Sequence, residues 1–357
     1  GTLGVTGVLT ATSLDISGDI DIDGTTNLDV VDIDGAANFA GNVTIATGAD
    51  LLTASAGDDN VRIGLDAGDS IASGGNRNIV IGRNAGTAIT TADSNVAIGW
   101  EALKTEDAHG NNVAIGASAL ATQNAGADGY NVGIGYNAGT AVTTGIRNSL
   151  VGGQSGDALN AGLDNTALGY NTLSTETSGA RSVAVGSEAL ATQNVGSGTA
   201  VYNSALGYAA GNAVTSGINN TFIGGRAGLL TTTASNNTSV GSNSLRANTT
   251  GHTNSSFGQD SMRFNTTGAQ NVAVGQQALH NNTSASDNVA VGFKTLFDNT
   301  TGSDNVAVGE LALTNNTTAV RNTALGASAL FTNTTGADNT AIGGGSLYAN
   351  TTASFNT

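Results

Sequence analysis

Cysteine and proline are both absent from this chain of 357 residues. Without cysteine, the chain forms neither a disulfide framework nor a thiolate metal site. No apolar run approaches the roughly 20 residues that a membrane-spanning helix needs, and no signal peptide opens the chain, so we expect no membrane insertion. No lysine or arginine precedes Arg62, and the net charge of -16 argues against nucleic acid as a partner.

A short repeat fills most of the chain. An asparagine, a small apolar stretch and a glycine recur seventeen times, and thirteen of the sixteen steps between successive glycines are 17 residues long. The other steps are 18, 19 and 21 residues, which indicates small insertions, and a constant period of this length is typical of a solenoid. The motif glycines are Gly64, Gly82, Gly99, Gly116, Gly135, Gly152, Gly169, Gly186, Gly207, Gly224, Gly241, Gly258, Gly275, Gly292, Gly309, Gly326 and Gly343.

Each repeat unit begins with asparagine, and its first five positions predict one short strand. The second position is apolar or a hydroxyl residue, the third is usually small, the fourth is always apolar and the fifth is the motif glycine, as in residues 271–275. Since side chains alternate along a strand, the second and fourth positions share one face and the third lies on the other. We therefore predict an all-β solenoid, a β-roll or β-helix of about 17 coils, rising about 80 Å at the usual spacing between strands.

The ninth and twelfth positions vary together. Eleven coils have Leu or Met at the ninth position and Glu, Gln or Asn at the twelfth. Five of the six coils with glycine at the ninth position have an aliphatic residue at the twelfth, as in Gly86 with Ile89, and the sixth has Leu229 and Leu230 nearby. We infer that both positions face one interior slot that is filled once per coil.

Asparagine occupies the first position in every coil except the one that begins at Ser182. Stacked asparagines can form a ladder in which each side-chain amide bonds to the next coil, although asparagine is also a common turn residue. The expected ladder includes Asn95, Asn112, Asn131, Asn165, Asn271, Asn288, Asn305, Asn322 and Asn339.

Residues 1–57 differ from the array at 58–357. Short stretches there alternate apolar residues with Asp or Thr, which predicts an acidic β-rich fibre shaft of three chains wrapped together, because so narrow a segment buries too little surface alone. Asp19, Asp21 and Asp23 match the first half of a calcium loop, but the bidentate acid is missing and alternating Asp on a wet strand face explains them as well. The chain ends at Asn356 and Thr357, where an eighteenth coil would open, so we expect the parent protein to continue on both sides.

No chemistry-bearing motif predicts an enzyme, a cofactor or a metal centre. His109, His252 and His280 lie in separate coils, and no acid or nucleophile accompanies them at a recognisable spacing.

Two surface features are candidates for contact with a ligand or partner. Aromatic residues directly follow five motif glycines, where they either stack on sugars or pack between coils or chains: Trp100, Tyr136, Tyr170, Tyr208 and Phe293. The two longer insertions, at 123–130 and 193–202, are the other candidate, because insertions in solenoids often make contacts.

Recurring Thr-Thr pairs give a rival interpretation. Asn-Thr-Thr occurs in one register at residues 248, 265, 299, 316, 333 and 350, which is typical of the flat threonine arrays of ice-binding solenoids. The tetrad Asn-Thr-Thr-Gly also has the composition of a turn.

The phrase Asn-Val-Ala-Val-Gly-x-x-Ala-Leu resembles the head repeat of trimeric autotransporter adhesins. The longer form with Asn-Thr-Thr-Gly is similar to repeats in phage tail fibres, and the 17-residue period favours the tail fibre over the bacterial adhesin head. The resemblance covers residues 60–357, and the first 57 residues look like the shaft repeats of the same fibres. It implies a left-handed β-roll, three copies about an axis, and a role in attachment.

From this resemblance we expect a non-enzymatic homotrimeric fibre segment on a virion tail or, alternatively, a bacterial surface. Its partners would be its own copies and a host cell-surface glycan or protein. Because close approach of three rolls needs small side chains, we expect the third-position alanines to form the trimer interface: Ala97, Ala114, Ala184, Ala273, Ala290, Ala307 and Ala324.

Overall fold

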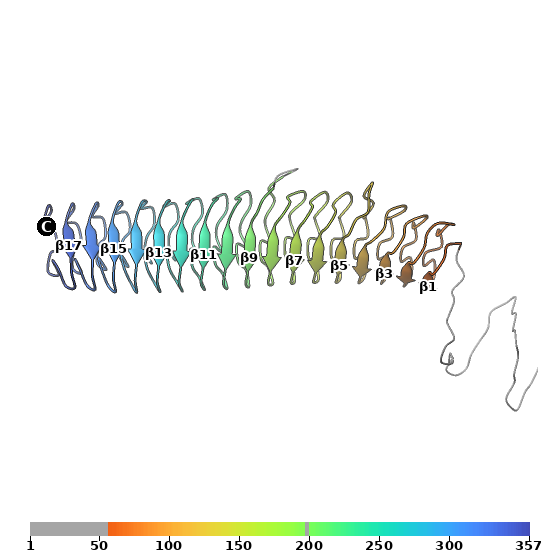
Figure 1. Cartoon of the computed structure of the whole chain (residues 1–357), viewed down its shortest axis with the longest axis horizontal. Helices are drawn as coiled ribbons and strands as arrows, with labels where there is room; N and C mark the ends of the chain where they lie inside the picture. The colour runs from red at the N-terminus through yellow and green to blue at the C-terminus, as the bar shows by residue number, and fades with distance from the viewer. Residues whose placement is uncertain (1–55, 197–199) are drawn as a thin grey trace, which may run out of the picture. The chain divides into compact units, whose positions relative to one another are not determined.

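The chain folds as an all-β parallel solenoid. The computed structural model describes residues 56–196 and 200–357, which belong to one compact unit, Leu52–Thr357. These residues form seventeen strands in about sixteen turns, and no helix occurs among them (Figure 1). The expected shaft, except for its last two residues, and the calcium candidates Asp19, Asp21 and Asp23 lie outside the described residues.

Every strand has three residues, at the second to fourth positions of its repeat unit. The strands are β1 (Val61–Ile63), β2 (Ile79–Ile81), β3 (Val96–Ile98), β4 (Val113–Ile115), β5 (Val132–Ile134), β6 (Ser149–Val151), β7 (Thr166–Leu168), β8 (Val183–Val185), β9 (Ser204–Leu206), β10 (Thr221–Ile223), β11 (Thr238–Val240), β12 (Ser255–Phe257), β13 (Val272–Val274), β14 (Val289–Val291), β15 (Val306–Val308), β16 (Thr323–Leu325) and β17 (Thr340–Ile342).

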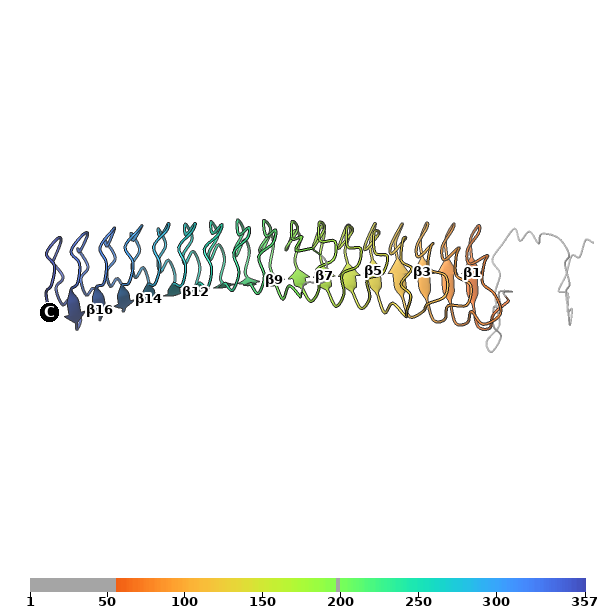
Figure 2. The ribbon, with the colours of Figure 1, turned by 90° about the horizontal axis from the view of Figure 1, so that it is seen from above.

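The strands form one parallel sheet in sequence order. Each strand pairs with the next in exact repeat register, so that Ala273 in β13 lies beside Ala290 in β14. Figure 2 shows the arrows face-on near β3 and almost edge-on near β12, so the sheet twists along the array as strand geometry favours.

The motif glycine ends each strand in a conformation that other residues avoid. At Gly309, φ is +129°, and a Cβ atom there would lie 2.6 Å from both the carbonyl carbon and the carbonyl oxygen of Gly326 in the next coil. Backbones of successive coils therefore touch at this position, and only glycine permits both the angle and the approach. Because every coil makes this contact with the next one, a glycine is required at the same position of every coil.

The third position of each repeat unit, which is the middle residue of its strand, faces the interior. All seven alanines expected at an inter-chain contact are completely buried within a single chain, so the predicted trimer interface is wrong. Leu103, Leu120 and their equivalents at the ninth position fill most of the interior, and the strand can place only a small side chain opposite them. The second and fourth positions consequently point outward.

The ninth position has a left-handed backbone in each coil of the array. Glycine adopts it without strain, as at Gly86 with a φ of +53°, whereas Leu279 holds a φ of +51°. A leucine in this region costs about 1–2 kcal/mol, which burial of its side chain, worth about 1.5–3 kcal/mol, offsets. The ninth position therefore accepts either glycine or leucine in the same left-handed backbone conformation.

The predicted compensation between the ninth and twelfth positions is confirmed. Ile89 is fully buried, and a Cβ atom on Gly86 would lie 2.7 Å from its Cδ1 atom, so the two positions share one slot. In the exceptional coil, Phe222 from the third position occupies the space beside Gly228, while Leu230 is exposed. The large third-position residue, and not the leucines nearby, makes up the missing volume there.

First-position asparagines form a buried ladder along the array. The side-chain oxygen of Asn288 accepts the main-chain N–H of Asn305 at 3.0 Å, and Asn305 repeats this with Asn322 at 3.0 Å. The amide nitrogen of Asn305 donates to the carbonyl of Ala319 at the end of its own coil, at 2.9 Å. Each of these asparagines thus accepts a hydrogen bond from the next coil and donates one to the end of its own coil. These bonds form a ladder, and they do not depend on whether the asparagine also lies in a turn.

The departure at Ser182 has a local explanation. Its main-chain N–H still donates to Asn165 Oδ1 at 2.9 Å, and its hydroxyl accepts the amide of Gln193 at 2.9 Å. Gln193 in turn accepts the amide of Asn203 at 2.9 Å, so the glutamine bridges the gap that the shorter serine leaves.

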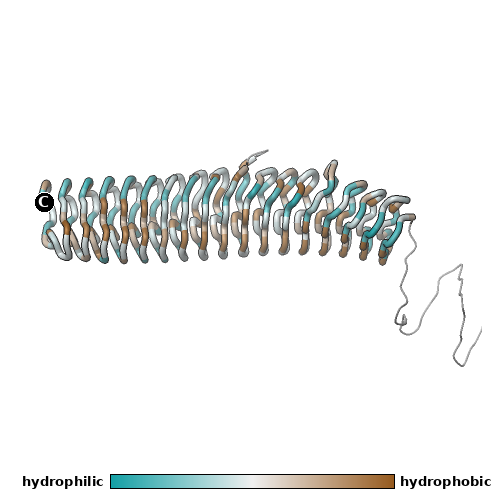
Figure 3. The backbone as a smooth tube through the Cα atoms, viewed as in Figure 1, coloured by the Kyte–Doolittle hydropathy of each residue, from teal (hydrophilic) through white to brown (hydrophobic). Residues whose placement is uncertain are grey.

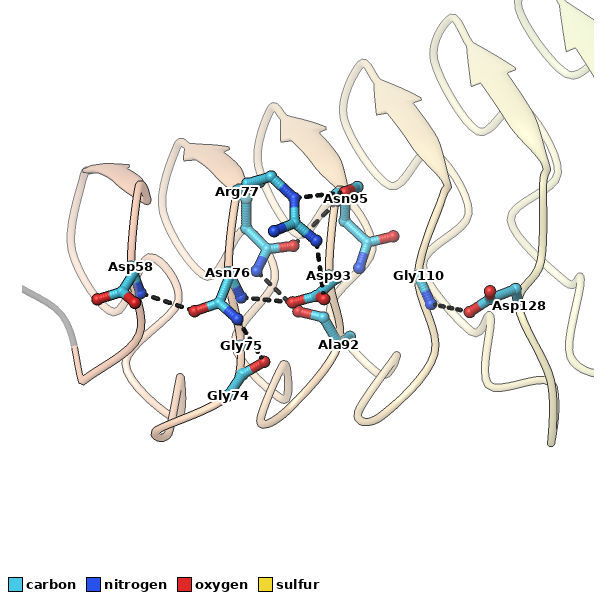
Figure 4. A network of polar contacts seen from close by, with 12 residues as sticks. Asp58, Gly74, Gly75, Asn76, Arg77, Ala92, Asp93, Asn95, Gly110 and Asp128 are labelled. Atoms are coloured by element: carbon cyan, nitrogen blue, oxygen red, sulfur yellow. Dashed lines mark hydrogen bonds and ion pairs between the residues drawn. The ribbon is translucent and has the colours of Figure 1, made fainter.

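Polar side chains also join neighbouring loops just before the strands. The main-chain N–H of Asp58 donates to Asn76 Oδ1, the N–H of Asn76 to Asp93 Oδ1, and the N–H of Gly110 to Asp128 Oδ1 (Figure 4). These bonds, between 2.7 and 2.9 Å, satisfy loop N–H groups that the sheet does not use.

Candidate interaction surface

The outward face of the sheet has an apolar residue at the fourth position of every coil, whereas the second position is apolar in nine coils and Ser or Thr in eight. The fourth position contains only aliphatic residues and Phe257, and these side chains are exposed or half-buried. Ile63, Leu168, Leu325 and Ile342 are each about half exposed or more. Apolar segments recur in a row on successive coils (Figure 3). Parallel sheets are normally covered on both faces, so this exposed apolar row is a candidate surface for contact with another chain.

Four of the five candidate aromatic residues form a regular comb. Trp100, Tyr136, Tyr170 and Tyr208 are all more than half exposed and follow the ends of β3, β5, β7 and β9, every second coil. The coils between them place small residues at the same position, Ala117, Gly153 and Ser187. The rings therefore recur about every 10 Å along the array. A Cβ atom on Gly153 would lie 3.6 Å from Tyr170 Cδ2, and the Arg226 guanidinium is 5.8 Å from the centre of the Tyr208 ring.

Phe293, the fifth candidate, stands apart from the comb. It follows β14, is less exposed than the other four, and has the Lys294 ammonium 5.4 Å from the centre of its ring.

The first insertion stands out from the neighbouring loops. Residues between β4 and β5 rise above the line of coils in Figure 1, and Tyr130 at the end of this loop is exposed. Residues 197–199 of the second insertion are outside the described part of the chain, and Tyr202 after them is exposed beneath the Arg181 guanidinium, 5.8 Å from the ring centre.

A shallow groove opens beside the first three coils. Its lining residues are Asp66, Asp69, Asn84, Thr87, Lys104 and Thr105.

The Thr-Thr rows already use the hydroxyl group of their first threonine. Thr266 Oγ1 donates to the carbonyl of Thr283 at 2.8 Å, and the same bond recurs from Thr249 to Thr266 and from Thr300 to Thr317. The hydroxyl groups of one of the two threonine rows are therefore already used in hydrogen bonds within the chain.

Ion pairs between coils lie on the exposed surface. Arg147 Nε donates to Asp164 Oδ1 at 2.6 Å, and Arg321 Nε donates to Asp338 Oδ1 at 2.7 Å. These hydrogen bonds hold the pKa of each aspartate below its ordinary value. Because the pairs are largely solvated, we expect them to stabilise the array little.

The expectation that no histidine has an acidic partner is wrong for His109. Its ring lies in one group with Glu106 and Asp107, whose metal-ligating atoms are all within 4.8 Å of one another. Burial raises the pKa of the Glu106 carboxyl above its ordinary value. A contiguous Glu-Asp-x-His segment was the signal in the sequence.

Neither of the other two histidines belongs to such a group in the part of the chain that the structure describes. His252 is exposed beside Thr253, and the ring of His280 stacks on Phe297 with centroids 4.8 Å apart.

Comparison with models of known protein families found no match, and comparison with curated protein sequences found none either. Across residues 56–196 and 200–357, no helix has the length and hydropathy to cross a bilayer.

Proposed function

We propose that this chain is a non-enzymatic fibre segment that assembles as a homotrimer, with the outward faces of three sheets packed about a common axis. The observation that carries the proposal is the strictly apolar fourth position on a solvent-facing strand face. A monomer would gain nothing from keeping this position apolar in every coil, whereas a self-association surface requires it.

The size of the apolar face fits an interface between chains. Each coil presents two outward side chains, and the area that packing would remove from water is on the order of 1,000 Å² per chain. A stable standard-size interface buries about 800 Å² per partner, so the face is large enough for assembly.

The proposed role is attachment, or extension of a distal tip towards a host surface. The array is long, rigid and regular, which suits a spacer, and its resemblance to tail-fibre repeats favours a virion tail fibre over the head of a bacterial adhesin. The comb of Trp100, Tyr136, Tyr170 and Tyr208 offers stacking platforms for a cell-surface glycan. An ice-binding role has weaker support because one threonine row is committed to hydrogen bonds within the chain.

Solution mass tests the assembly. We expect light scattering after size exclusion to give three times the chain mass, and replacement of two outward residues, Val274→Asp with Val308→Asp, to reduce it to that of one chain. The matched control is Ser284→Asp, which adds a carboxylate on an exposed loop. A monomer for the unaltered chain, or an intact trimer of the double variant, would contradict the proposed interface.

Glycan binding tests the attachment role separately. We expect the assembled trimer to bind specific glycans on a glycan microarray. We expect the variant Trp100→Ala with Tyr136→Ala to lose this binding. A correctly assembled trimer that binds no glycan and no host cell would leave only the spacer role.

A further inference from the structure

Two pairs of coils share one arrangement and differ in how well it is satisfied. Glu106 and Gln123 occupy the twelfth position of successive coils, and Glu176 and Gln193 do the same further along the array. Both glutamines precede an insertion and follow the same Ala-Leu-Ala-Thr sequence. The two pairs are therefore a natural comparison within one molecule.

The Glu176 pair has its hydrogen bonds complete. The Gln193 amide donates to Glu176 Oε2 at 3.0 Å, and the main-chain N–H of Gly179 donates to Glu176 Oε1 at 2.7 Å. Both oxygens of this buried carboxylate accept a hydrogen bond, as a buried charge requires.

The Glu106 pair leaves three buried polar atoms unsatisfied. Glu106 is completely buried, and its Oε1 atom accepts the main-chain N–H of His109 at 3.1 Å. Glu106 Oε2, His109 Nδ1 and Gln123 Nε2 have no hydrogen-bond partner among the described residues. Buried carboxylates are normally paired with a cation or coordinated to a metal, and none of the described lysine or arginine side chains forms an ion pair with Glu106.

Two of the residue differences between the pairs lie beside the buried glutamate and add a metal-ligating group. Asp107 and His109 stand where the Glu176 pair has Thr177 and Gly179. Glu106 Oε1 and His109 Nδ1 are 3.6 Å apart, and the ligand atoms of the three residues lie within 4.8 Å. Ligands bound at about 2.0–2.2 Å to one ion lie about 3–4 Å apart, so only Asp107 has to move closer.

We propose that Glu106, Asp107 and His109 bind one divalent first-row transition metal ion, with zinc as the reference ion. An imidazole nitrogen with two carboxylate oxygens is a donor set that these ions accept, and the two carboxylates balance the charge of the ion. The group lies at the surface of the array, since 29% of the His109 side chain is exposed while Glu106 is completely buried.

The loop that carries the three residues is held at both ends. The carbonyl of Asp107 accepts the main-chain N–H of Thr90 at 2.7 Å and its hydroxyl at 2.9 Å. Gly110, directly after His109, donates to Asp128 Oδ1 at 2.9 Å (Figure 4). The site therefore has a preformed backbone and needs only side-chain adjustment.

A zinc titration of the chelator-treated full chain tests the proposal. We expect isothermal titration calorimetry to show one zinc ion per chain, and cobalt(II) to give the visible absorption bands of a protein-bound ion. The matched variant Asp107→Thr with His109→Gly places the residues of the Glu176 pair at these two positions, so we expect it to fold and to bind neither ion. His252→Ala, which removes an exposed histidine elsewhere, is the control and should bind as the unaltered chain does.

Two results would overturn the site. One is equal zinc uptake by the double variant, which would place the ion elsewhere. The other is no uptake by the unaltered chain up to the micromolar range, with the His109 ring protonated near neutral pH in NMR spectra, which would assign the group to an ion pair between His109 and Glu106. Both readouts are independent of whether the chain is a trimer.

Discussion

Replacement of Asn305 by alanine should weaken the contact between two specific coils. Asn305 is completely buried, and its side chain donates to the carbonyl of Ala319 and accepts the main-chain N–H of Asn322. Asn305→Ala removes both bonds and leaves the buried N–H group of Asn322 without a partner, whereas the carbonyl of Ala319 still accepts the amide of Asn316 at 3.1 Å. At about 1–3 kcal/mol for the unsatisfied N–H group and about 1 kcal/mol for the lost bond to Ala319, the expected loss is about 2–4 kcal/mol.

The effect should be local before it is global. In a solenoid each coil contacts only its neighbours, so a weakened contact allows the array to open there. We expect the Asn322 amide and β16 to exchange hydrogen about thirty- to seven-hundred-fold faster, since each 1.4 kcal/mol corresponds to a factor of ten. We also expect the midpoint of urea unfolding to fall.

Asn124→Ala is the matched control, because Asn124 is exposed on a loop. The ladder explanation fails if Asn305→Ala exchanges at Asn322 and unfolds in urea as this control does.

Two further substitutions test other parts of the array. Gly309→Ala should destabilise the array by several kcal/mol, because the new Cβ would meet the Gly326 backbone at 2.6 Å, whereas Gly225→Ala has open space and should change the unfolding midpoint little; equal effects would argue against the coil-to-coil contact. Burial raises the pKa of Asp157, whose Oδ1 atom is buried without a partner among the described residues. The folded state thus holds the proton more tightly than the unfolded state, and Asp157→Asn should be more stable than the unaltered chain at pH 7. This advantage should shrink as the pH falls towards the ordinary value of 3.8, and an advantage that is independent of pH would contradict it.

Much of the architecture could be predicted because each coil repeats the same packing problem. Comparison of seventeen copies takes the place of an alignment, so the pairing of Gly86 with Ile89 indicated a shared interior slot before any coordinates. The asparagine ladder could also be anticipated, since a residue that recurs beside every strand must stack on itself.

The main error in the prediction concerns which face of each strand points to the interior. Alternation places Val272 and Val274 on one face and Ala273 on the other, but the pattern is the same whichever face is inside. Close approach of three chains predicts small residues at the inter-chain contact, and close packing inside one chain predicts the same residues in the interior. The structure shows that the interior is the crowded side, because Leu279 already occupies it from the opposite wall.

The Glu106 group was missed for a related reason. In the sequence, the signal is that His109 stands where the equivalent coil has Gly179. Only the coordinates show that the two glutamates differ in hydrogen bonding, since both coils carry the same residues at the ninth and twelfth positions.

The sequence by itself determined the period, the number of coils, the short strand in each and the slot between the ninth and twelfth positions. These follow from spacing and side-chain volume, which are properties of the chain alone. The tertiary structure decided which strand face is inside, why glycine and leucine share a left-handed position, and which polar atoms remain unsatisfied. Those depend on how closely one coil lies on the next, and a distance between coils is set only when the chain has closed on itself.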